Sequence, residues 1–222
     1  HAFIQAHDDE TLAFERFARS RPDNLVLLID TYDTEAGARK VVALAPRLKA
    51  AGIALRGVRL DSGDLARHAR AVRAILDAAG LIEVKIFASG GLDEDRLAAF
   101  AASAVPIDGF GIGTSLVTSE DAPALDCAYK LQEYDGIARR KRSEGKLTWP
   151  GRKQVFRRFA ADGTMAEDIL TLAGDAQTRE ALLQPVMRAG RLGKPLPTLN
   201  AIRDHAPGSS IHTCSHGSTP NC

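Results

Sequence analysis

The sequence has almost no surplus charge, few cysteines and no long apolar run, and each shortage excludes a class of protein. Its 29 Lys and Arg against 28 Asp and Glu leave a formal charge of +1, so no basic surplus attracts nucleic acid or anionic lipid. No apolar stretch approaches the roughly 20 residues that a membrane span requires, and no secretory signal opens the chain. We therefore expect a cytoplasmic protein with no nucleic-acid or membrane partner.

Cysteine usage agrees with that compartment. Three cysteines in 222 residues form no disulfide framework, and Cys127 is the only one before the last sixteen residues. The segment 207–222 contains no Asp, Glu, Lys or Arg, so we expect 206–222 to be a disordered or aberrant tail. The metal-binding residue types of this tail match no standard zinc spacing, so no metal site is expected from His212, Cys214, His216 and Cys222.

The rest of the chain has the composition of a packed globular protein, with 45% hydrophobic and 26% charged residues. Short apolar runs predict buried parallel strands, each followed by a helix or a turn, at 25–30, 57–60, 84–88 and 107–114. The ends of these strands lie roughly 25–30 residues apart, which is typical of successive βαβ units. The sequence therefore predicts an α/β fold.

This alternation stops near residue 125. Short strands are predicted around turns at Asp135-Gly136 and Pro150-Gly151, at 128–134, 137–142 and 153–159. Helices are predicted at 167–172 and 177–184. We expect three regions, namely an α/β region with the functional site at 1–125, a β-rich and helical region at 126–205, and the tail at 206–222.

Acidic residues gather at the first two predicted strand ends, where ligands bind in parallel sheets. Asp30 and Asp61 each terminate an apolar strand, where an unpaired carboxylate would be costly. Asp33 and Asp64 have helix capping as an alternative role. Arg59 should point to the same side as Asp61, and either pairs with it or binds a carboxylate or phosphate. Such acids suit a polyhydroxylated, magnesium-associated or cationic ligand.

Glycines and hydroxyls follow the next two predicted strands. Glycines at neighbouring strand ends let backbone N–H groups approach an anion without an intervening Cβ. A phosphate cradle is therefore predicted from Ser89, Gly90, Gly91, Gly113 and Thr114. The alternative is that these glycines serve only the turns.

Seven segments, in order over residues 1–175, resemble the nicotinate phosphoribosyltransferase family. The two specific motifs are LIDTYDT at 28–34 and RLDSGD at 59–64. The others are HAF at 1–3, SGGLDE at 89–94, FGIGT at 110–114, YKL at 129–131 and PGRKQV at 150–155.

The resemblance implies an irregular α/β barrel of the type II phosphoribosyltransferase kind, joined to a β-rich domain, in a cytoplasmic homodimer. It implies an enzyme of NAD biosynthesis that joins nicotinate to phosphoribosyl pyrophosphate, releases pyrophosphate and couples the reaction to ATP hydrolysis. Mg²⁺ and ATP are the cofactor and co-substrate expected. Since a complete barrel has eight strands, four βα units make only part of one.

The resemblance also assigns roles to residues. His1 matches the histidine that ATP phosphorylates, and Asp30 matches the acid that supports it by holding one ring nitrogen. Asp61 is the third expected catalytic residue. The loop that holds nicotinate and the ribose with its magnesium-bound pyrophosphate is matched by Arg59, Asp61, Ser62 and Asp64. The 5′-phosphate site is matched by Ser89, Gly90, Gly91, Gly113 and Thr114.

Three other functions remain open from the residues. One is a nicotinamide or other pyridine phosphoribosyltransferase, and another is an inactive fragment that binds phosphoribosyl ligands. A barrel isomerase or aldolase would need a poised Lys or Glu at a strand end, and none is found. Because the family places further substrate-binding residues upstream of the histidine, we expect this chain to be its later half and inactive alone.

Overall fold

A computed structural model describes residues 1–119, 121 and 127–208, and for 205–208 only the backbone. The predicted tail at 206–222 therefore lies almost entirely outside the described residues. The chain divides into two compact units, His1–Gly151 and Arg152–Cys222. Each unit is described by itself.

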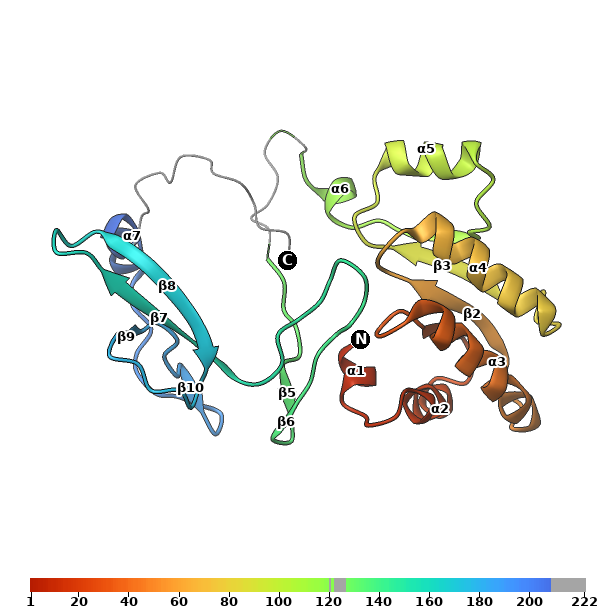
Figure 1. The fold of residues 1–222 in the computed structure, drawn as a ribbon, viewed down its shortest axis with the longest axis horizontal. Coiled ribbons are helices and arrows are strands. Elements are labelled where there is room, and N and C mark those ends of the chain that lie inside the picture. Colours follow the sequence, from red (N-terminus) through yellow and green to blue (C-terminus); the bar gives the residue numbers. More distant parts are fainter. Residues whose placement is uncertain (120, 122–126, 209–222) are drawn as a thin grey trace. The chain divides into compact units, whose positions relative to one another are not determined.

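The first unit is built on a four-stranded parallel sheet with the strand order β1-β2-β3-β4 (Figure 1). Its strands are β1 (Leu25–Leu28), β2 (Leu55–Leu60), β3 (Lys85–Ser89) and β4 (Gly109–Gly111). The helices that follow them are α3 (Thr34–Ala50), α4 (Leu65–Ala78), α5 (Glu94–Ala102) and the short α6 (Thr114–Val117). This confirms an α/β fold with a parallel sheet, and no sheet among the described residues is closed.

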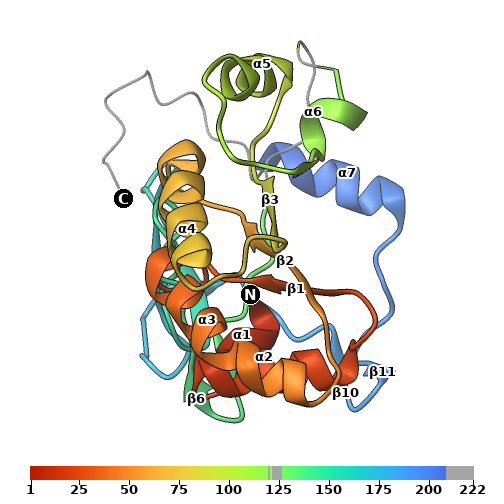
Figure 2. The same ribbon diagram turned by 90° about the vertical axis from the view of Figure 1, so that its right-hand side faces the viewer.

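Two helices that the sequence analysis did not predict precede the sheet. They are α1 (Ala2–Gln5) and α2 (Glu10–Ser20). Helix α2 packs against α3 and α1 packs against α2, as Figure 2 shows from the side. This arrangement brings the start of the chain beside the end of β1.

Helix capping places the polar turns after the strands. Asp33 Oδ1 accepts from the backbone N–H of Ala36 at 2.7 Å, and Asp64 Oδ1 accepts from that of Arg67 at 3.0 Å. Each bond satisfies a free donor in the first turn of a helix, α3 or α4. The capping alternative for these two acids is therefore correct.

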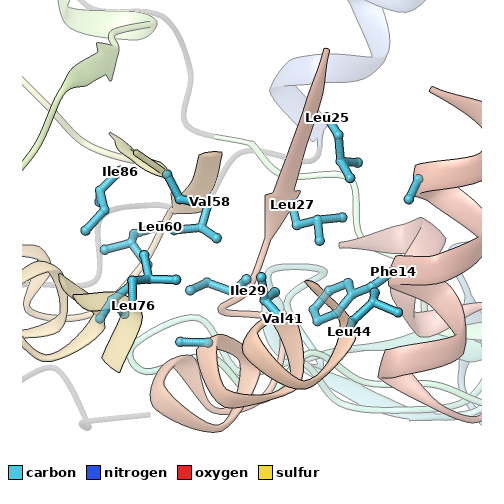
Figure 3. Packing of buried hydrophobic residues seen from close by; sticks show 14 of the residues in the cluster. Phe14, Leu25, Leu27, Ile29, Val41, Leu44, Val58, Leu60, Leu76 and Ile86 are labelled. Atoms are coloured by element: carbon cyan, nitrogen blue, oxygen red, sulfur yellow. The ribbon is translucent and has the colours of Figure 1, made fainter. Parts of the chain in front are cut away.

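The core of this unit lies between the sheet and the two helices α3 and α4. Alternate strand residues, among them Leu27, Leu60 and Ile86, are fully buried against Val41 and other apolar residues of these helices (Figure 3). Each such side chain contributes about 1.5–3 kcal/mol by leaving water. Helix α3 approaches β1 so closely that a Cβ on Gly37 would overlap the backbone oxygen of Ile29.

The opposite face of the sheet carries a different set of side chains. Because strand residues alternate between faces, Arg59 and Phe87 point away from the core that holds their neighbours. The ring of Phe87 covers two glycines on the adjacent strands, since a Cβ on Gly57 or on Gly109 would lie 2.8 Å from it. The Arg59 side chain therefore lies on the face of the sheet opposite the core and reaches Ser89 at the end of β3.

Residues 127–151 complete the first unit with a hairpin and an irregular return. The hairpin consists of β5 (Glu133–Tyr134) and β6 (Ile137–Ala138), which are shorter than the strands predicted at 128–134 and 137–142. Its turn is at Asp135-Gly136 as predicted, with positive φ at both residues. Beyond β6 the chain leaves the hairpin without regular structure and returns to the carboxyl ends of the parallel strands.

The second unit is a small antiparallel arrangement. Strand β7 (Lys153–Phe159) pairs with β8 (Met165–Leu172) and β9 (Glu180–Ala181), and a separate hairpin joins β10 (Met187–Arg188) to β11 (Arg191–Leu192). Helix α7 (Leu199–Gly208) follows. No helix in the described parts of either unit is long and apolar enough to cross a membrane.

The helices predicted at 167–172 and 177–184 are wrong, because the first segment lies in strand β8 and the second is irregular apart from the two residues of β9. Exposure along β8 alternates from one residue to the next, which is the two-residue period of a strand. Its acids pair across the sheet, since Arg157 binds Asp168 at 2.8 Å and Arg158 binds Glu167 at 2.7 Å. The partners of these two acids come from β7, so the sequence of 167–172 alone does not indicate a paired strand.

Candidate functional site

The polar ends of β1, β2 and β3 meet in one group of side chains at the carboxyl edge of the parallel sheet. The sequence-predicted residues that the structure brings together are His1, Asp30, Arg59, Asp61, Ser62 and Ser89. This is the edge at which parallel sheets hold their ligands. The same group also includes residues from the irregular return of the chain, described below.

Asp30 links the first two strand ends. Its side chain is 1% exposed, and its Oδ2 accepts from the backbone N–H of Asp61 at 2.9 Å and from the hydroxyl of Ser62. Its other oxygen, Oδ1, has no hydrogen-bond partner among the described residues. A buried carboxylate oxygen without a donor is costly, so this atom is available to a ligand or to a neighbouring side chain that moves.

His1 lies against both acids. Its Nδ1 is 3.0 Å from the hydroxyl of Thr31, and its Nε2 is 3.4 Å from Asp61 Oδ2 and 3.9 Å from Asp30 Oδ1. The ring therefore has a hydroxyl on one nitrogen and two carboxylates on the other. Carboxylates on one side fix the proton there and leave the opposite nitrogen with its lone pair.

Asp61 is the centre of the group. Its Oδ1 accepts from Ser89 Oγ at 2.6 Å and from Arg59 Nη2 at 3.3 Å, and Arg59 Nε in turn donates to Ser89 Oγ at 2.9 Å. Burial by itself raises the pKa of Asp61, but the hydrogen bond from Ser89 and the charges of Lys146 and Arg59 outweigh it. The net effect is a lowered pKa, so Asp61 is held as a carboxylate.

The irregular segment 139–148, which we call the lysine loop, adds two amines that the sequence analysis missed. Lys146 Nζ lies 3.2 Å from Asp61 Oδ2 and also donates to the backbone oxygen of Asp61. Lys141 Nζ lies 3.9 Å from the same carboxylate oxygen. The available signal was the basic run RRKRSEGK at 139–146, the first part of which was predicted to belong to a strand at 137–142.

Backbone contacts hold the lysine loop at this edge. Ser143 Oγ donates to the backbone oxygen of Asp30, and the N–H of Arg142 donates to that of Thr31 at 3.0 Å. Lys141 N–H donates to Thr148 Oγ1 at 3.0 Å, which closes the loop on itself. The loop is therefore tied to the end of β1 while its amines reach the end of β2.

Lys141 is a buried amine, with a side chain only 1% exposed and an Nζ that has no hydrogen-bond partner among the described residues. Burial lowers the pKa of Lys141 to about 8, with a smaller contribution in the same direction from the charge of Lys146. The carboxylates of Asp30 and Asp61 oppose this shift because they stabilise the charged amine. A buried ammonium group that has no hydrogen-bond acceptor is stabilised by an anion placed beside it. An anion bound at this edge would satisfy the amine of Lys141.

A hollow of about 400 Å³ opens beside this group, between the ends of β2, β3 and β4. The residues that line it include all five of the predicted phosphate cradle, namely Ser89, Gly90, Gly91, Gly113 and Thr114, together with Arg59 and Asp61. At Gly90 the absence of a side chain is required, because φ is +96° and a Cβ would overlap the backbone oxygen of Asp61. A Cβ on Gly113 would meet nothing within 4 Å, so that glycine is not required by space.

Asp64 is the one predicted site residue that stands apart from the group, since its carboxylate caps α4. The described residues contain no cluster of three or more His, Cys, Asp or Glu that could hold a metal ion by themselves. A divalent cation at this edge would therefore need oxygens from a ligand as well as from the protein.

Comparison with known proteins gives a consistent result. No family model matches the chain. Nicotinate phosphoribosyltransferase pncB2 from Mycobacterium tuberculosis is 52% identical over 207 residues, which cover 93% of this chain and 44% of that protein. Nicotinate phosphoribosyltransferase pncB1 from the same organism is 37% identical over 203 residues, covering 86% of this chain and 44% of that protein.

Among solved structures, the nicotinate phosphoribosyltransferase from Vibrio cholerae aligns with a TM-score of 0.54 at 25% identity, covering 66% of this chain and 39% of that one. The chain thus spans less than half the length of each of these three relatives.

Proposed function

We propose that this chain, which resembles a partial region of the nicotinate phosphoribosyltransferases, carries the phosphoryl-transfer and phosphoribosyl-binding part of such an enzyme. The reaction joins nicotinate to phosphoribosyl pyrophosphate, forms nicotinate mononucleotide and pyrophosphate, and is coupled to ATP hydrolysis in NAD biosynthesis. The single observation that carries the proposal is the position of Asp61, which faces His1 on one side and the glycine-lined hollow on the other.

In this proposal His1 receives a phosphoryl group from ATP. With the proton on Nε2, which faces Asp61 and Asp30, the lone pair is on Nδ1, beside the Thr31 hydroxyl. Nδ1 then forms a bond to the γ-phosphorus of ATP as the bond to ADP breaks. The two acids stabilise the positive charge that the ring gains in this step.

The hollow is proposed to hold the 5′-phosphate of the phosphoribosyl group. Support comes from Gly90 and Gly91, which line the hollow with positive φ and no Cβ to keep a ligand from their backbone N–H groups, and from the Ser89 hydroxyl. Arg59 borders both the hollow and Asp61, so it is placed to bind a phosphate oxygen or the carboxylate of nicotinate. Asp64 is proposed to act indirectly, because its carboxylate caps α4 and so fixes the start of this helix after Asp61 and Ser62.

Pyrophosphate is proposed to bind beside Lys141 and Lys146. Their amines lie within 4 Å of Asp61 Oδ2, and Lys141 lacks a hydrogen-bond partner among the described residues. An anion with several oxygens would satisfy both amines and restore favourable solvation to the buried one. The same amines stabilise the negative charge that grows on pyrophosphate as it leaves.

Mg²⁺ fits this site as a companion of the pyrophosphate. Asp30 Oδ1 and Asp61 would be its protein ligands, because the first is an orphaned buried oxygen and the second is held ionised. When bound, the cation would neutralise charge on the departing pyrophosphate.

Three further features belong to the same proposal and are supported by the resemblance alone. They are the closure of the open sheet into an irregular barrel, a homodimer, and a cytoplasmic location. The open face of the sheet at Arg59 and Phe87 is compatible with the first of these.

The proposal is tested at two levels. Calorimetry measures whether the 222-residue chain binds phosphoribosyl pyrophosphate. A chimera in which this chain replaces the aligned segment of the M. tuberculosis pncB2 is then assayed for nicotinate mononucleotide with nicotinate, phosphoribosyl pyrophosphate, ATP and Mg²⁺. Parallel assays use nicotinamide as the base.

We expect binding by the chain and product from nicotinate by the chimera. Product mainly from nicotinamide would support a different pyridine phosphoribosyltransferase instead. Binding by the chain with an inactive chimera would support a phosphoribosyl-binding protein without turnover, and no binding with no product would refute the proposal.

A further inference from the structure

A second cluster of charged side chains lies next to the lysine loop, at the start of helices α3 and α4. Glu144 Oε2, from the loop, is 3.2 Å from Nε2 of His68 on α4. The other ring nitrogen of His68, Nδ1, is 2.8 Å from Oε1 of Glu35 on α3. The His68 side chain is 6% exposed, whereas that of Glu144 is 59% exposed. A buried imidazole thus joins two acids that lie far apart in the sequence.

His68 belongs to a network that also contains Arg67 and the two acids. Arg67 Nη2 lies 3.0 Å from His68 Nε2, and because a guanidinium only donates, this ring nitrogen accepts from Arg67, while Nδ1 faces Glu35. Arg67 faces the same two acids, with Nη2 3.1 Å from Glu144 and Nη1 3.8 Å from Glu35. Hydrogen bonds between charged partners are about twice as strong as neutral ones, so this network is suited to holding an exposed loop.

The RLDSGD motif makes room for this network. Gly63 has φ +72°, and a Cβ at this position would lie 2.8 Å from Glu144 Oε2 and 2.9 Å from His68 Nε2. Any side chain at residue 63 would therefore displace Glu144 or His68. The motif that supplies Asp61 to the site also leaves the space that Glu144 occupies.

Glu144 lies between the two lysines of the loop. Its neighbour Ser143 is bonded to Asp30, and Lys146 is bonded to Asp61. Restraining a long, flexible lysine in one position costs conformational entropy, so an irregular loop needs several anchors to keep two amines at one carboxylate. Glu144 is the anchor that reaches helices outside the site.

We propose that Glu144, held by Arg67 beside the buried His68, is a positioning residue that keeps Lys141 and Lys146 against Asp61. The inference rests on the proposed function in one respect, since it assigns those amines to pyrophosphate. It adds a chain of three residues, none of which contacts the reacting groups, on which the placement of both amines depends.

The first test measures the loop without any ligand. The 222-residue chain and its variants react with a water-soluble acetylating reagent, and mass spectrometry follows the rate at Lys141. We expect Glu144→Ala to raise this rate roughly tenfold, because charge-assisted hydrogen bonds that hold the loop closed are lost. Glu144→Gln, which keeps an acceptor oxygen, should restore most of the protection. An unchanged rate in Glu144→Ala would refute the anchor.

A matched control removes an exposed ion pair elsewhere on α4. Asp77 binds Arg73 at 2.8 Å at the far end of this helix, so Asp77→Ala should leave the Lys141 rate unchanged. Glu144 is an exposed loop residue, and its substitution should leave the urea midpoint of the chain unchanged as well. A lowered midpoint that accounts for the faster labelling would mean that Glu144 serves global stability alone, and would overturn the proposal.

The second test links the anchor to the site. Calorimetry with inorganic pyrophosphate and Mg²⁺ should show binding that weakens roughly tenfold in Glu144→Ala and recovers in Glu144→Gln, because the amines are no longer pre-positioned. His68→Gln should resemble Glu144→Ala. If the unsubstituted chain binds no pyrophosphate, the proposed function of the lysines fails while the labelling result still decides the anchor. Equal affinity of the unsubstituted chain and Glu144→Ala would overturn the positioning role.

Discussion

The backbone N–H of Asp61 donates a hydrogen bond of 2.9 Å to the carboxylate of Asp30, so the acid at the end of one strand holds the loop at the end of the next. The hydroxyl of Ser62 donates to the same oxygen. Asp30 Oδ2 is therefore occupied by structural bonds, whereas Oδ1 faces His1 Nε2. One buried carboxylate serves both the fold and the proposed chemistry.

Substitution of Asp30 should separate these two roles. Asp30→Ala leaves the Asp61 amide and the Ser62 hydroxyl without an acceptor, and should lower the free energy of unfolding by about 2–4 kcal/mol. Asp30→Asn retains an acceptor oxygen and should cost about 1 kcal/mol. Urea unfolding of the chain measures both. Equal losses in the two variants would show that Oδ2 does not hold the Asp61 loop.

Asp61 should be essential for function and of little importance for the fold. We expect Asp61→Asn and Arg59→Ala to abolish nicotinate mononucleotide formation by the chimera and to weaken binding of phosphoribosyl pyrophosphate by the chain. Both side chains point away from the apolar core, so the far-ultraviolet circular dichroism should be unchanged. Near-normal activity in both variants would remove these residues from the site.

The lowered pKa of Asp61 has a separate consequence in acid. Its folded-state pKa lies below the ordinary value of 3.8, so its contribution to stability is present above that value and is lost as the pH falls through the folded-state pKa. The unsubstituted chain should therefore lose more stability than Asp61→Asn below about pH 4. Identical acid-unfolding curves would contradict the ion pairs drawn to Asp61.

His1 should accept a phosphoryl group from ATP. Chain or chimera incubated with ATP labelled in the γ-phosphate should gain an adduct that is labile in acid and stable in base, as expected for phosphohistidine. His1→Ala should remove the label. His7 is a matched control, because its Nδ1 contacts the backbone oxygen of Phe3 and, in the described part of the chain, no acid, so His7→Ala should keep the label. Label on a serine would refute the assignment.

Lys141 should make stability depend on pH in alkaline solution. Its folded-state pKa is about 8 against 10.5 for the ordinary amine, so between these values the unfolded chain binds more protons and stability rises with pH. At pH 7 the buried charge costs up to about 3 kcal/mol, which Lys141→Met should recover. The advantage of Lys141→Met should shrink towards pH 10. If the difference in unfolding free energy between the two chains stayed constant from pH 7 to 10, the amine of Lys141 would be in contact with water and the lowered pKa would be contradicted.

The same amine provides a signal of ligand binding. If pyrophosphate binds beside Lys141, the added negative charge raises the pKa of the amine, and the complex takes up a proton near pH 8.5. Calorimetry in two buffers of different ionisation enthalpy measures this uptake. Lys141→Met should abolish it, whereas substitution of the exposed Lys85, which pairs with Asp108, should not.

The sequence predicted the parallel half of the fold well because that half is built from local signals. Apolar runs, capping acids such as Asp33 and Asp64, and terminal glycines each act within one βα unit. The second unit lacks such signals, since β8 is defined by its pairing with β7 rather than by its own composition. Two adjacent acids, Glu167 and Asp168, interrupt the alternation of polar and apolar residues that would have indicated a strand in β8. The segment was therefore wrongly predicted as a helix.

The site divides in the same way. His1, Asp30, Arg59, Asp61 and Ser89 were found because each lies in a motif next to a strand end. Lys141 and Lys146 were missed because they come from a loop some 80 residues after Asp61 in the chain, as the separations of their contacts show. Long-range placement of an irregular loop depends on tertiary contacts that no local pattern records.

The packing of Phe87 between Gly57 and Gly109 also limits the order in which substitutions at these positions can accumulate during evolution. A side chain cannot be introduced at Gly57 or Gly109 while an aromatic ring remains at 87, since its Cβ would lie 2.8 Å from that ring. A smaller residue at 87 must come first, and it leaves a void until a larger residue follows at 109. Residue 87 therefore controls what can follow at Gly109, whereas a Cβ on Gly57 would still lie 2.9 Å from the backbone oxygen of Lys85 whatever residue 87 is.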